Sequence, residues 1–162
     1  MRLFKHLFAP SAKRLFPADS LQRIAAAIAD SELRHSGEIC FAVEPALHPR
    51  AVWSGGQARD RALEAFAQLR VWDTQANNGV LLYLLLADHR IEIVADRGFD
   101  GRVSAEQWRE VCHLIETGLK AGEPEAAVLR GVEALSALLT QHFPRGDGDH
   151  DANELPDLPY IL

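Results

Sequence analysis

The strongest constraint on the fold is the stretch NNGVLLYLLLADHRIEIVADRGFDG, residues 77–101 of the 162-residue chain. Residues 79–87 are continuously apolar, as expected of a strand that is covered on both faces. After Asp88 and His89, isoleucine or alanine recurs at every second position of residues 90–95, which is typical of a β-strand. Two strand-like runs separated by two polar residues predict a β-hairpin.

A two-residue turn at Asp88-His89 decides which residues of the two strands face each other. The predicted cross-strand pairs are Ala87–Arg90, Leu84–Ile93 and Leu81–Asp96. In this register the end of the second strand lies beside the beginning of the first strand. We therefore expect Asn77 and Asn78 to lie close to Asp96.

The segments around the hairpin follow helical and strand-like patterns. Apolar residues at helical spacing predict helices that begin near Asp19, cover residues 57–70, run from Ser104 to Gly122, and run from Pro124 to Pro144. Capping-box spacing marks two of these helix starts, at Asp19–Gln22 and Ser104–Gln107. A strand is expected at residues 38–44, and loops are expected at HPRAVWSGG and VWDTQANN.

The order of these elements defines a fold class. The strand at residues 38–44, the helix at 57–70 and the strand at 79–87 form a βαβ unit, whose strands run parallel with a right-handed crossover. The hairpin adds an antiparallel strand at the edge of the sheet. We predict an α/β fold, namely a Rossmann-like three-layer α/β/α sandwich with a small mixed sheet.

Charge is unevenly distributed along the chain. The formal net charge is −6, which excludes a general nucleic-acid binder because such a protein needs a basic face. Residues 1–14 nevertheless carry a net +4, and the segment from residue 145 onward carries a net −4. We therefore divide the chain into a basic N-terminal arm (residues 1–16), an α/β domain (17–144) and an acidic, mobile tail (145–162).

The chain shows no targeting signal. Charged residues interrupt the apolar residues of the first sixteen positions, so no secretory h-region is present, and no window approaches the roughly 18 apolar residues that span a bilayer. Cys40 and Cys112 are the only cysteines. We expect a cytoplasmic protein whose two thiols are reduced and structural.

The N-terminal arm, MRLFKHLFAPSAKRLF, interleaves aromatic and leucine side chains with basic ones. We favour an arm that packs its aromatic side chains on the body of the domain. The alternative is a short amphipathic segment that makes peripheral contact with an anionic membrane.

Oxygen donors collect at one edge of the predicted sheet. The candidate ligands are Asp73, Asn77, Asn78, Asp96 and Asp100. Carboxylate and amide oxygens suit Ca²⁺ or Mg²⁺, and a metal held there could in turn bind a phosphate. The alternative is that these residues only supply turns and caps, because Asn, Asp and Gly tolerate unusual backbone angles.

Other candidate sites are weaker. The acidic segment DGDHDANE, residues 147–154, alternates acids as calcium loops do but lacks their Gly and their final Glu, so it is interpreted as a solvated tail. The seven histidines lack zinc-ligand spacing, and the chain contains no nucleophile elbow or phosphate-binding loop.

The hairpin stretch, the long helix after it and the segment AGEPEAAVLRGVEAL together resemble the TPM domain. The resemblance covers roughly residues 18–143 and is closest to a small soluble bacterial branch. The family includes a thylakoid-lumen acid phosphatase, a photosystem II repair factor and many bacterial proteins of unknown role. The resemblance implies an α/β/α sandwich and, in many relatives, a signal peptide and a membrane segment that this sequence does not show.

The functional pattern of the family is kept only in part. Relatives with reported metal binding or phosphatase activity commonly carry Asp-Asn-Gly before the central strand, where this chain has Asn77-Asn78-Gly79. After the hairpin they carry Gly-Tyr-Gly-Leu-Glu-Gly, where this chain has Asp96-Arg97-Gly98-Phe99-Asp100-Gly101. Replacing a carboxylate by an amide removes one charge, which weakens binding of Ca²⁺.

Two functional hypotheses follow. The first is a non-enzymatic accessory domain that acts with an unidentified protein partner, among membrane or envelope proteins, and whose sheet edge binds a divalent cation weakly. The second is a weak metal-dependent acid phosphatase acting on phosphate monoesters. In the second hypothesis Asp96 and Asp100 hold the metal, and Asn77 or Asn78 orients the phosphate.

Overall fold

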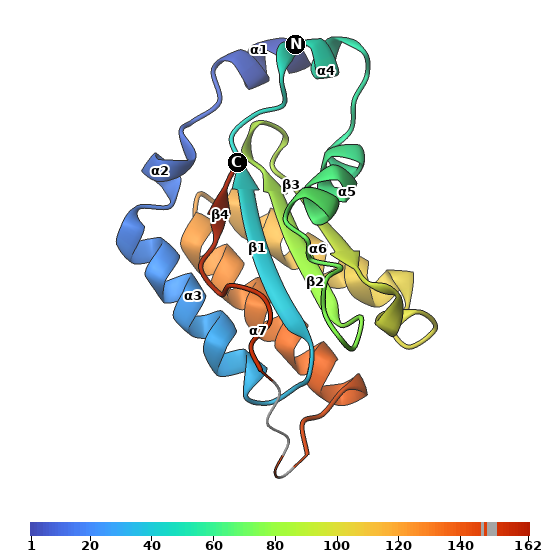
Figure 1. Cartoon of the computed structure of the whole chain (residues 1–162). Coiled ribbons are helices and arrows are strands. Elements are labelled where there is room, and N and C mark those ends of the chain that lie inside the picture. Colours follow the sequence, from blue (N-terminus) through green and yellow to red (C-terminus); the bar gives the residue numbers. More distant parts are fainter. Residues whose placement is uncertain (147, 149–151) are drawn as a thin grey trace.

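The computed structural model describes residues 1–146, 148 and 152–162 and has three layers, with a central sheet between two layers of helices (Figure 1). In chain order the elements are α1 (Arg2–Leu7), α2 (Ala12–Leu15), α3 (Ala18–Glu32), β1 (Glu38–Glu44), α4 (Pro49–Trp53), α5 (Ala58–Gln68), β2 (Gly79–Leu85), the 3-10 turn η1 (Leu86–Asp88), β3 (Arg90–Ala95), the 3-10 turn η2 (Arg97–Phe99), α6 (Ala105–Lys120), α7 (Pro124–His142) and β4 (Tyr160–Ile161). The predicted three-layer α/β fold is confirmed.

The sheet has four strands in the order β3-β2-β1-β4. β1 runs parallel to β2, as the predicted βαβ unit requires, and β3 runs antiparallel to β2. β4, which the sequence analysis did not predict, runs parallel to β1 at the other edge.

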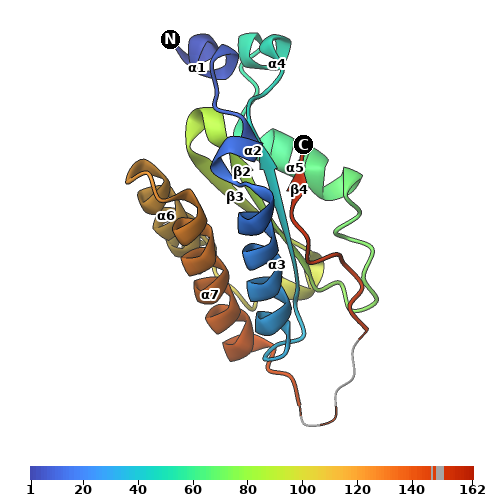
Figure 2. The same ribbon diagram turned by 90° about the vertical axis from the view of Figure 1, so that its left-hand side faces the viewer.

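Alternate residues of the strands face two separate cores. Ile39, Phe41 and Val43 of β1 lie in the larger core, which the sheet shares with helices α3, α6 and α7. Cys40 and Ala42 lie in the smaller core, which the sheet shares with α5. Every residue of β2 is buried, as expected of a central strand covered on both faces. Figure 2 shows the sheet edge-on between these layers.

The hairpin register differs from the prediction by two residues. The observed pairs are Leu85–Arg90, Leu84–Ile91, Leu82–Ile93 and Val80–Ala95. Leu86–Asp88 forms a 3-10 turn and His89 adopts a left-handed conformation with φ 48°, so the connection has four residues instead of two. Because side chains repeat with period two, a two-residue shift leaves each side chain on its predicted face. The predicted proximity of the two strand ends is therefore kept.

Two local predictions are wrong for identifiable reasons. α3 begins at Ala18, beside the predicted start, but the capping box expected at Asp19–Gln22 does not form: Pro17 is the N-cap, and Asp19 lies in the first turn, where its charge favours the positive end of the helix. The segment around Pro49 forms the short helix α4 instead of a loop, because Pro is well suited to the first helical turn and the His48 side chain accepts a hydrogen bond from Arg50 N.

The C-terminal segment is not wholly a mobile tail. Leu155 is buried in the smaller core, its N–H donates to the Glu38 carboxylate at 3.2 Å, and Tyr160–Ile161 forms the edge strand β4. Half of the acidic segment 147–154, namely residues 147 and 149–151, lies outside the described residues.

Helices α1 and α4 lie together at one end of the molecule, beyond the sheet, in both views (Figures 1 and 2). In the described part of the chain, no helix combines the length and the apolar character needed to cross a bilayer.

Candidate functional site

The predicted oxygen donors lie at the edge of the sheet where β2 begins and β3 ends. We call Asp73, Asn77, Asn78, Asp96 and Asp100 the rim residues. The expected proximity is confirmed for Asn77, whose carbonyl oxygen accepts a hydrogen bond from Gly98 N at 2.9 Å. Its side-chain oxygen accepts a second bond from Arg97 Nε at 3.0 Å. A guanidinium group therefore already uses this amide oxygen.

Asn78 points to a different partner. It is almost fully buried, and its side-chain amide nitrogen donates to the carbonyl oxygen of Ser36. Its own carbonyl oxygen accepts from Glu38 N at 3.0 Å, so Asn78 ties the start of β2 to the start of β1. The side-chain oxygen Oδ1 is buried and has no hydrogen-bond partner in the described part of the chain.

The three rim aspartates have three separate environments. Asp96 Oδ1 accepts from Arg97 N at 2.7 Å and caps the turn η2, whereas its buried Oδ2 has no partner among the described residues. Asp73 is exposed and forms an ion pair with Arg70 at 2.5 Å. Asp100 is exposed and follows η2.

These residues do not fit a preformed metal centre. Across the described ranges, no group of three or more His, Cys, Asp or Glu side chains is arranged to hold a metal ion. Two rim oxygens are bound by arginines. The glycines that could admit a ligand are packed against the chain itself: a Cβ on Gly79 would lie 2.0 Å from the Val71 carbonyl oxygen, and one on Gly98 would lie 2.3 Å from that of Asn77.

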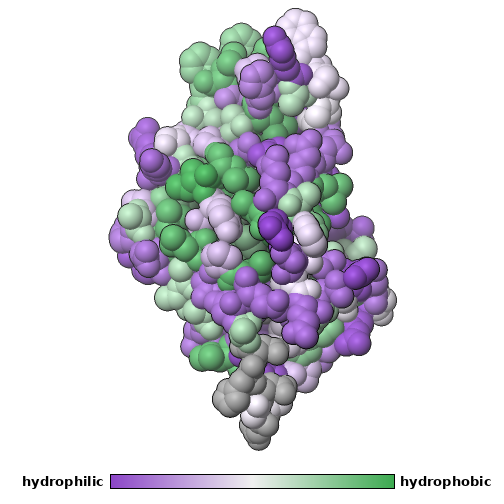
Figure 3. Space-filling view, viewed as in Figure 1, coloured by the Kyte–Doolittle hydropathy of each residue, from purple (hydrophilic) through white to green (hydrophobic). Residues whose placement is uncertain are grey.

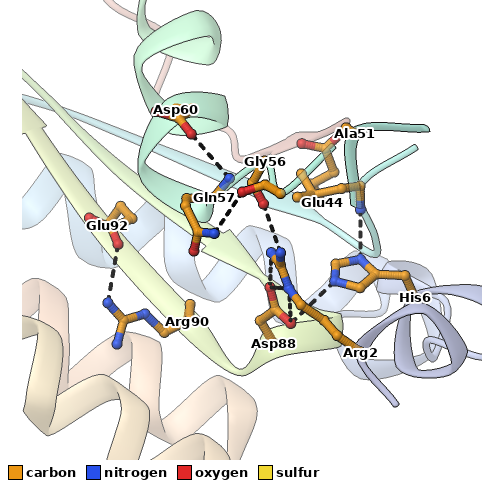
Figure 4. Close-up of polar contacts among 12 residues, drawn as sticks. Arg2, His6, Glu44, Ala51, Gly56, Gln57, Asp60, Asp88, Arg90 and Glu92 are labelled. Atoms are coloured by element: carbon orange, nitrogen blue, oxygen red, sulfur yellow. Dashed lines mark hydrogen bonds and ion pairs between the residues drawn. The ribbon is translucent and has the colours of Figure 1, made fainter. Parts of the chain in front are cut away.

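The opposite end of the hairpin holds a polar cluster that sequence reasoning missed. Figure 4 shows Asp88 accepting hydrogen bonds from Arg2 and facing His6. Arg2 Nη2 lies 2.8 Å from Asp88 Oδ2, and Arg2 Nη1 donates to the Gly56 carbonyl oxygen at 2.8 Å. Burial by itself raises the pKa of Asp88, but hydrogen bonding and charge from Arg2 outweigh it and lower the pKa overall. We call Arg2, His6 and Asp88 the latch.

The ring of His6 is held on both sides. Leu47 N–H donates to His6 Nδ1 at 3.0 Å, so Nδ1 acts as the acceptor and Nε2 carries the proton that faces Asp88 Oδ1 at 3.2 Å. Only the i,i+4 spacing of Arg2 and His6 hints at this arrangement in the sequence, because Asp88 belongs to a distant turn.

Of the apolar side chains of α1, Leu3 packs in part on the smaller core, whereas Phe4 and Leu7 lie in solvent. Phe4 is 64% exposed and Phe8, just after the helix, is 79% exposed. Leu7 is also exposed, and Trp53 at the end of α4 is 85% exposed. We call Phe4, Leu7, Phe8 and Trp53 the apolar end. Figure 3 shows hydrophobic surface gathered at this end of the molecule, beside hydrophilic side chains.

The expectation that the arm packs its aromatic side chains on the domain holds for only part of the arm. Phe16 is fully buried and packs edge-to-face on Phe41, with ring centroids 5.9 Å apart. Phe4 and Phe8 are not packed on the domain, because Arg2 and His6 of α1 face the domain instead.

Comparisons with known proteins agree with this fold. The TPM domain model matches residues 11–138, and because the match covers most of the chain, the protein belongs to the TPM domain family. The NMR structure of the BA42 protein from the psychrophilic bacterium Bizionia argentinensis is similar, with a TM-score of 0.79 and 28% sequence identity over 91% of this chain and 95% of that chain. No curated protein matches the sequence. The predicted resemblance is thus confirmed.

Proposed function

We propose that this TPM domain is a non-enzymatic accessory domain that recognises a partner through its apolar end and not through chemistry at its rim. The observation that carries the proposal is the orientation of α1, which turns Arg2 and His6 inward and leaves Phe4 and Phe8 exposed. A contiguous exposed apolar group on a soluble domain marks an interaction site.

The rim has a secondary role in this proposal, as a weak site for Ca²⁺ or Mg²⁺. Asp96 Oδ2 and Asn78 Oδ1 are buried acceptors without partners among the described residues, which favours some affinity for a cation. Binding at Asn77 requires Arg97 to leave, and that displacement costs the 3.0 Å hydrogen bond between the two side chains. Affinity is therefore expected to be low.

The alternative function is a weak metal-dependent acid phosphatase that hydrolyses phosphate monoesters. The unpartnered oxygen of Asp96 favours it, because a carboxylate oxygen without a hydrogen bond is free to bind a metal ion. The Arg97–Asn77 bond and the ion pair of Asp73 with Arg70 count against it, since both occupy oxygen atoms of the five candidate metal ligands.

Phosphatase assays separate the two functions. Hydrolysis of p-nitrophenyl phosphate is measured with Ca²⁺ and with Mg²⁺ for the wild-type protein, for Asp100→Asn and for the control Glu110→Gln, which alters an exposed acid on α6. The proposal predicts no turnover above background in any of them. Turnover that falls in Asp100→Asn and persists in Glu110→Gln would overturn it in favour of the phosphatase.

An NMR titration with Ca²⁺ tests the secondary role. We expect weak, saturable amide shifts at residues 73–80 and 96–101 in the wild-type protein. Arg97→Ala frees Asn77 Oδ1 and removes a positive charge, so it should tighten binding several-fold. Equal affinity in both proteins would show that Arg97 does not compete with the cation.

A further inference from the structure

Helix α1 packs only Leu3 on the domain in part and otherwise reverses the usual orientation of a packed helix. A helix packed on a protein normally turns its apolar stripe inward and its polar side outward. Here Arg2 and His6, one turn apart, face inward to Asp88, while Phe4, Leu7 and adjacent Phe8 are exposed. The contacts of Arg2 and His6 with Asp88 fix the orientation of α1, so the exposed aromatic side chains have a defined place on the surface.

A second element from a distant part of the sequence extends the same surface. Trp53 at the end of α4 is 85% exposed, although α4 packs against α1. Between the two helices runs an open groove of about 430 Å³. Its lining is Leu3, Leu7, Pro49, Arg50, Trp53 and Ser54. The groove is wide enough for apolar side chains or for part of a lipid chain to enter.

The two stretches of chain that include α1 and α4 carry only positive charge. Residues 1–18 contain Arg2, Lys5, Lys13 and Arg14 and no acid, a net of +4. Residues 45–59 contain Arg50 and Arg59 and no acid, a net of +2. The two segments together carry +6 in a chain whose net charge is −6. Asp88, from the hairpin connection, also lies at this end, where it forms an ion pair with Arg2.

We propose that the end formed by α1 and α4 docks on an anionic lipid surface, which names the partner for the interaction role proposed above and rests on it. Aromatic and leucine side chains would enter the boundary between headgroups and acyl chains, and Lys5 and Arg50 would contact lipid phosphates. Trp and Phe beside Lys and Arg, at a protruding end whose acid Asp88 is paired with Arg2, suit that boundary.

Charge argues against a second copy of this chain as the occupant, because both ends would be net positive: α1 and α4 carry Arg2, Lys5 and Arg50, and Asp88 offsets one of these charges. Adhesion to lipid needs more than one weak signal, and this end supplies two of them, apolar insertion and basic charge.

Vesicle flotation of the full chain tests the proposal. Vesicles of phosphatidylcholine alone are compared with vesicles in which about one third of the lipid is phosphatidylserine. We expect binding to the anionic vesicles, weakened by salt, and little binding to the neutral ones. Phe4→Ser/Phe8→Ser should weaken binding roughly tenfold or more, because two exposed aromatic side chains no longer insert. Lys5→Glu/Arg50→Glu should abolish the preference for anionic lipid.

Matched controls change the same chemistry elsewhere. Leu33→Ser/Leu114→Ser removes exposed apolar side chains outside the apolar end, and Arg109→Glu/Lys120→Glu makes the same charge change on α6. Both control pairs should float like the wild-type protein, and circular dichroism verifies that every variant is folded.

Three results would overturn the proposal. The first is absence of flotation. If the protein then binds polyglutamate instead, the partner is an acidic protein. The second is equal loss of binding in the control pairs. The third is concentration-dependent dimerisation that disappears in Phe4→Ser/Phe8→Ser, which would assign the surface to a second copy. None of these results bears on phosphatase turnover, so failure here is distinct from failure of the non-enzymatic role.

Discussion

Asp88 is the residue on which the position of α1 depends, because it accepts from Arg2 and faces His6 within one partly buried cluster. It lies in the hairpin connection, where sequence reasoning assigned it only a turn. Its partners are more than 80 residues away in the chain. No local pattern encodes a contact of that length, so the latch could not be predicted from the sequence.

We expect Asp88→Asn to release α1. The variant loses a charge-assisted pair and leaves Arg2 partly buried without an anion, a loss of about 1 to 3 kcal/mol in the free energy of unfolding. Trypsin should then cleave at Lys5 faster than in the wild-type protein. Asp30→Asn is the control, since it breaks the exposed ion pair with Arg34 and should cost less than about 1 kcal/mol.

The pH dependence of the latch has a definite sign. Since the folded-state pKa of Asp88 is lowered, its contribution is present above the ordinary carboxyl pKa of about 4 and is lost as the pH falls through the folded value. Unchanged cleavage in Asp88→Asn, or release of α1 in the wild-type protein near neutral pH, would contradict this account.

The raised pKa of Glu32 should make the stability of the domain depend on pH in the opposite direction to the latch. Burial raises its pKa to about 8, and the bond from Ile39 N at 2.7 Å lowers it by less. Between pH about 4.5 and 8 the unfolded chain binds fewer protons than the folded one at this group, so stability falls as the pH rises.

Glu32→Gln cannot ionise and should therefore be more stable than the wild-type protein at pH 8 by roughly 2 to 4 kcal/mol, with a smaller difference at pH 5. Urea unfolding at the two pH values measures this. Burial also raises the pKa of Glu38, so a residual slope of the same sign is expected. An unchanged slope in Glu32→Gln would show that Glu32 is ionised in the folded protein.

At the scale of elements, the sequence predicted strands and long helices well and short ones poorly. β1, β2, β3, α5, α6 and α7 follow from apolar periodicity, and the Ser104–Gln107 capping box forms as expected. α1, α4 and β4 were not predicted, because each has at most six residues and is held by tertiary contacts. The proximity of the start of β2 to the end of β3 was predicted correctly even though the hairpin register was not, since a two-residue shift keeps the strand ends together.

Helices α6 and α7 pack closely at Gly131. A Cβ on Gly131 would lie 2.3 Å from Ile115 Cδ1, and Ile115 is fully buried. Gly131→Ala gains about 1 kcal/mol in helix propensity but overpacks the core by about 1 to 3 kcal/mol, so we expect a net loss of stability in urea unfolding.

Ile115→Ala removes both atoms that a Cβ on Gly131 would meet most closely, Cδ1 at 2.3 Å and Cγ1 at 2.4 Å, and supplies the matched test. In that background Gly131→Ala should be less destabilising than in the wild-type protein. Equal losses in both backgrounds would mean that the helices separate freely and that the contact does not determine their spacing.

At the scale of the whole molecule, the last residues complete the sheet. Leu155 and Tyr160 pack with the smaller core that contains Cys40, and β4 pairs with β1. The acidic composition of residues 145–162 as a whole hid this role. Residues 155–162 themselves contain only one acid, Asp157, among apolar and Pro residues. Composition averaged over 145–162 describes the acidic half and not the packed half.

A chain that ends at Asn153 should therefore expose Cys40. Burial raises the pKa of this thiol to about 12, so in the full chain it should react very slowly with a disulfide reagent. In a Cys112→Ser background we expect roughly tenfold or faster modification after truncation. Equal rates in the two chains would show that β1 is covered without the C-terminal segment.

The central claim is that the functional surface lies at the apolar end and not at the rim, and amide NMR mapping with a soluble short-chain phosphatidylserine tests it most directly. We predict shifts confined to residues 1–8 and 48–54, which build α1 and α4. Shifts confined to residues 73–80 and 96–101 would contradict the account and return the search to the rim.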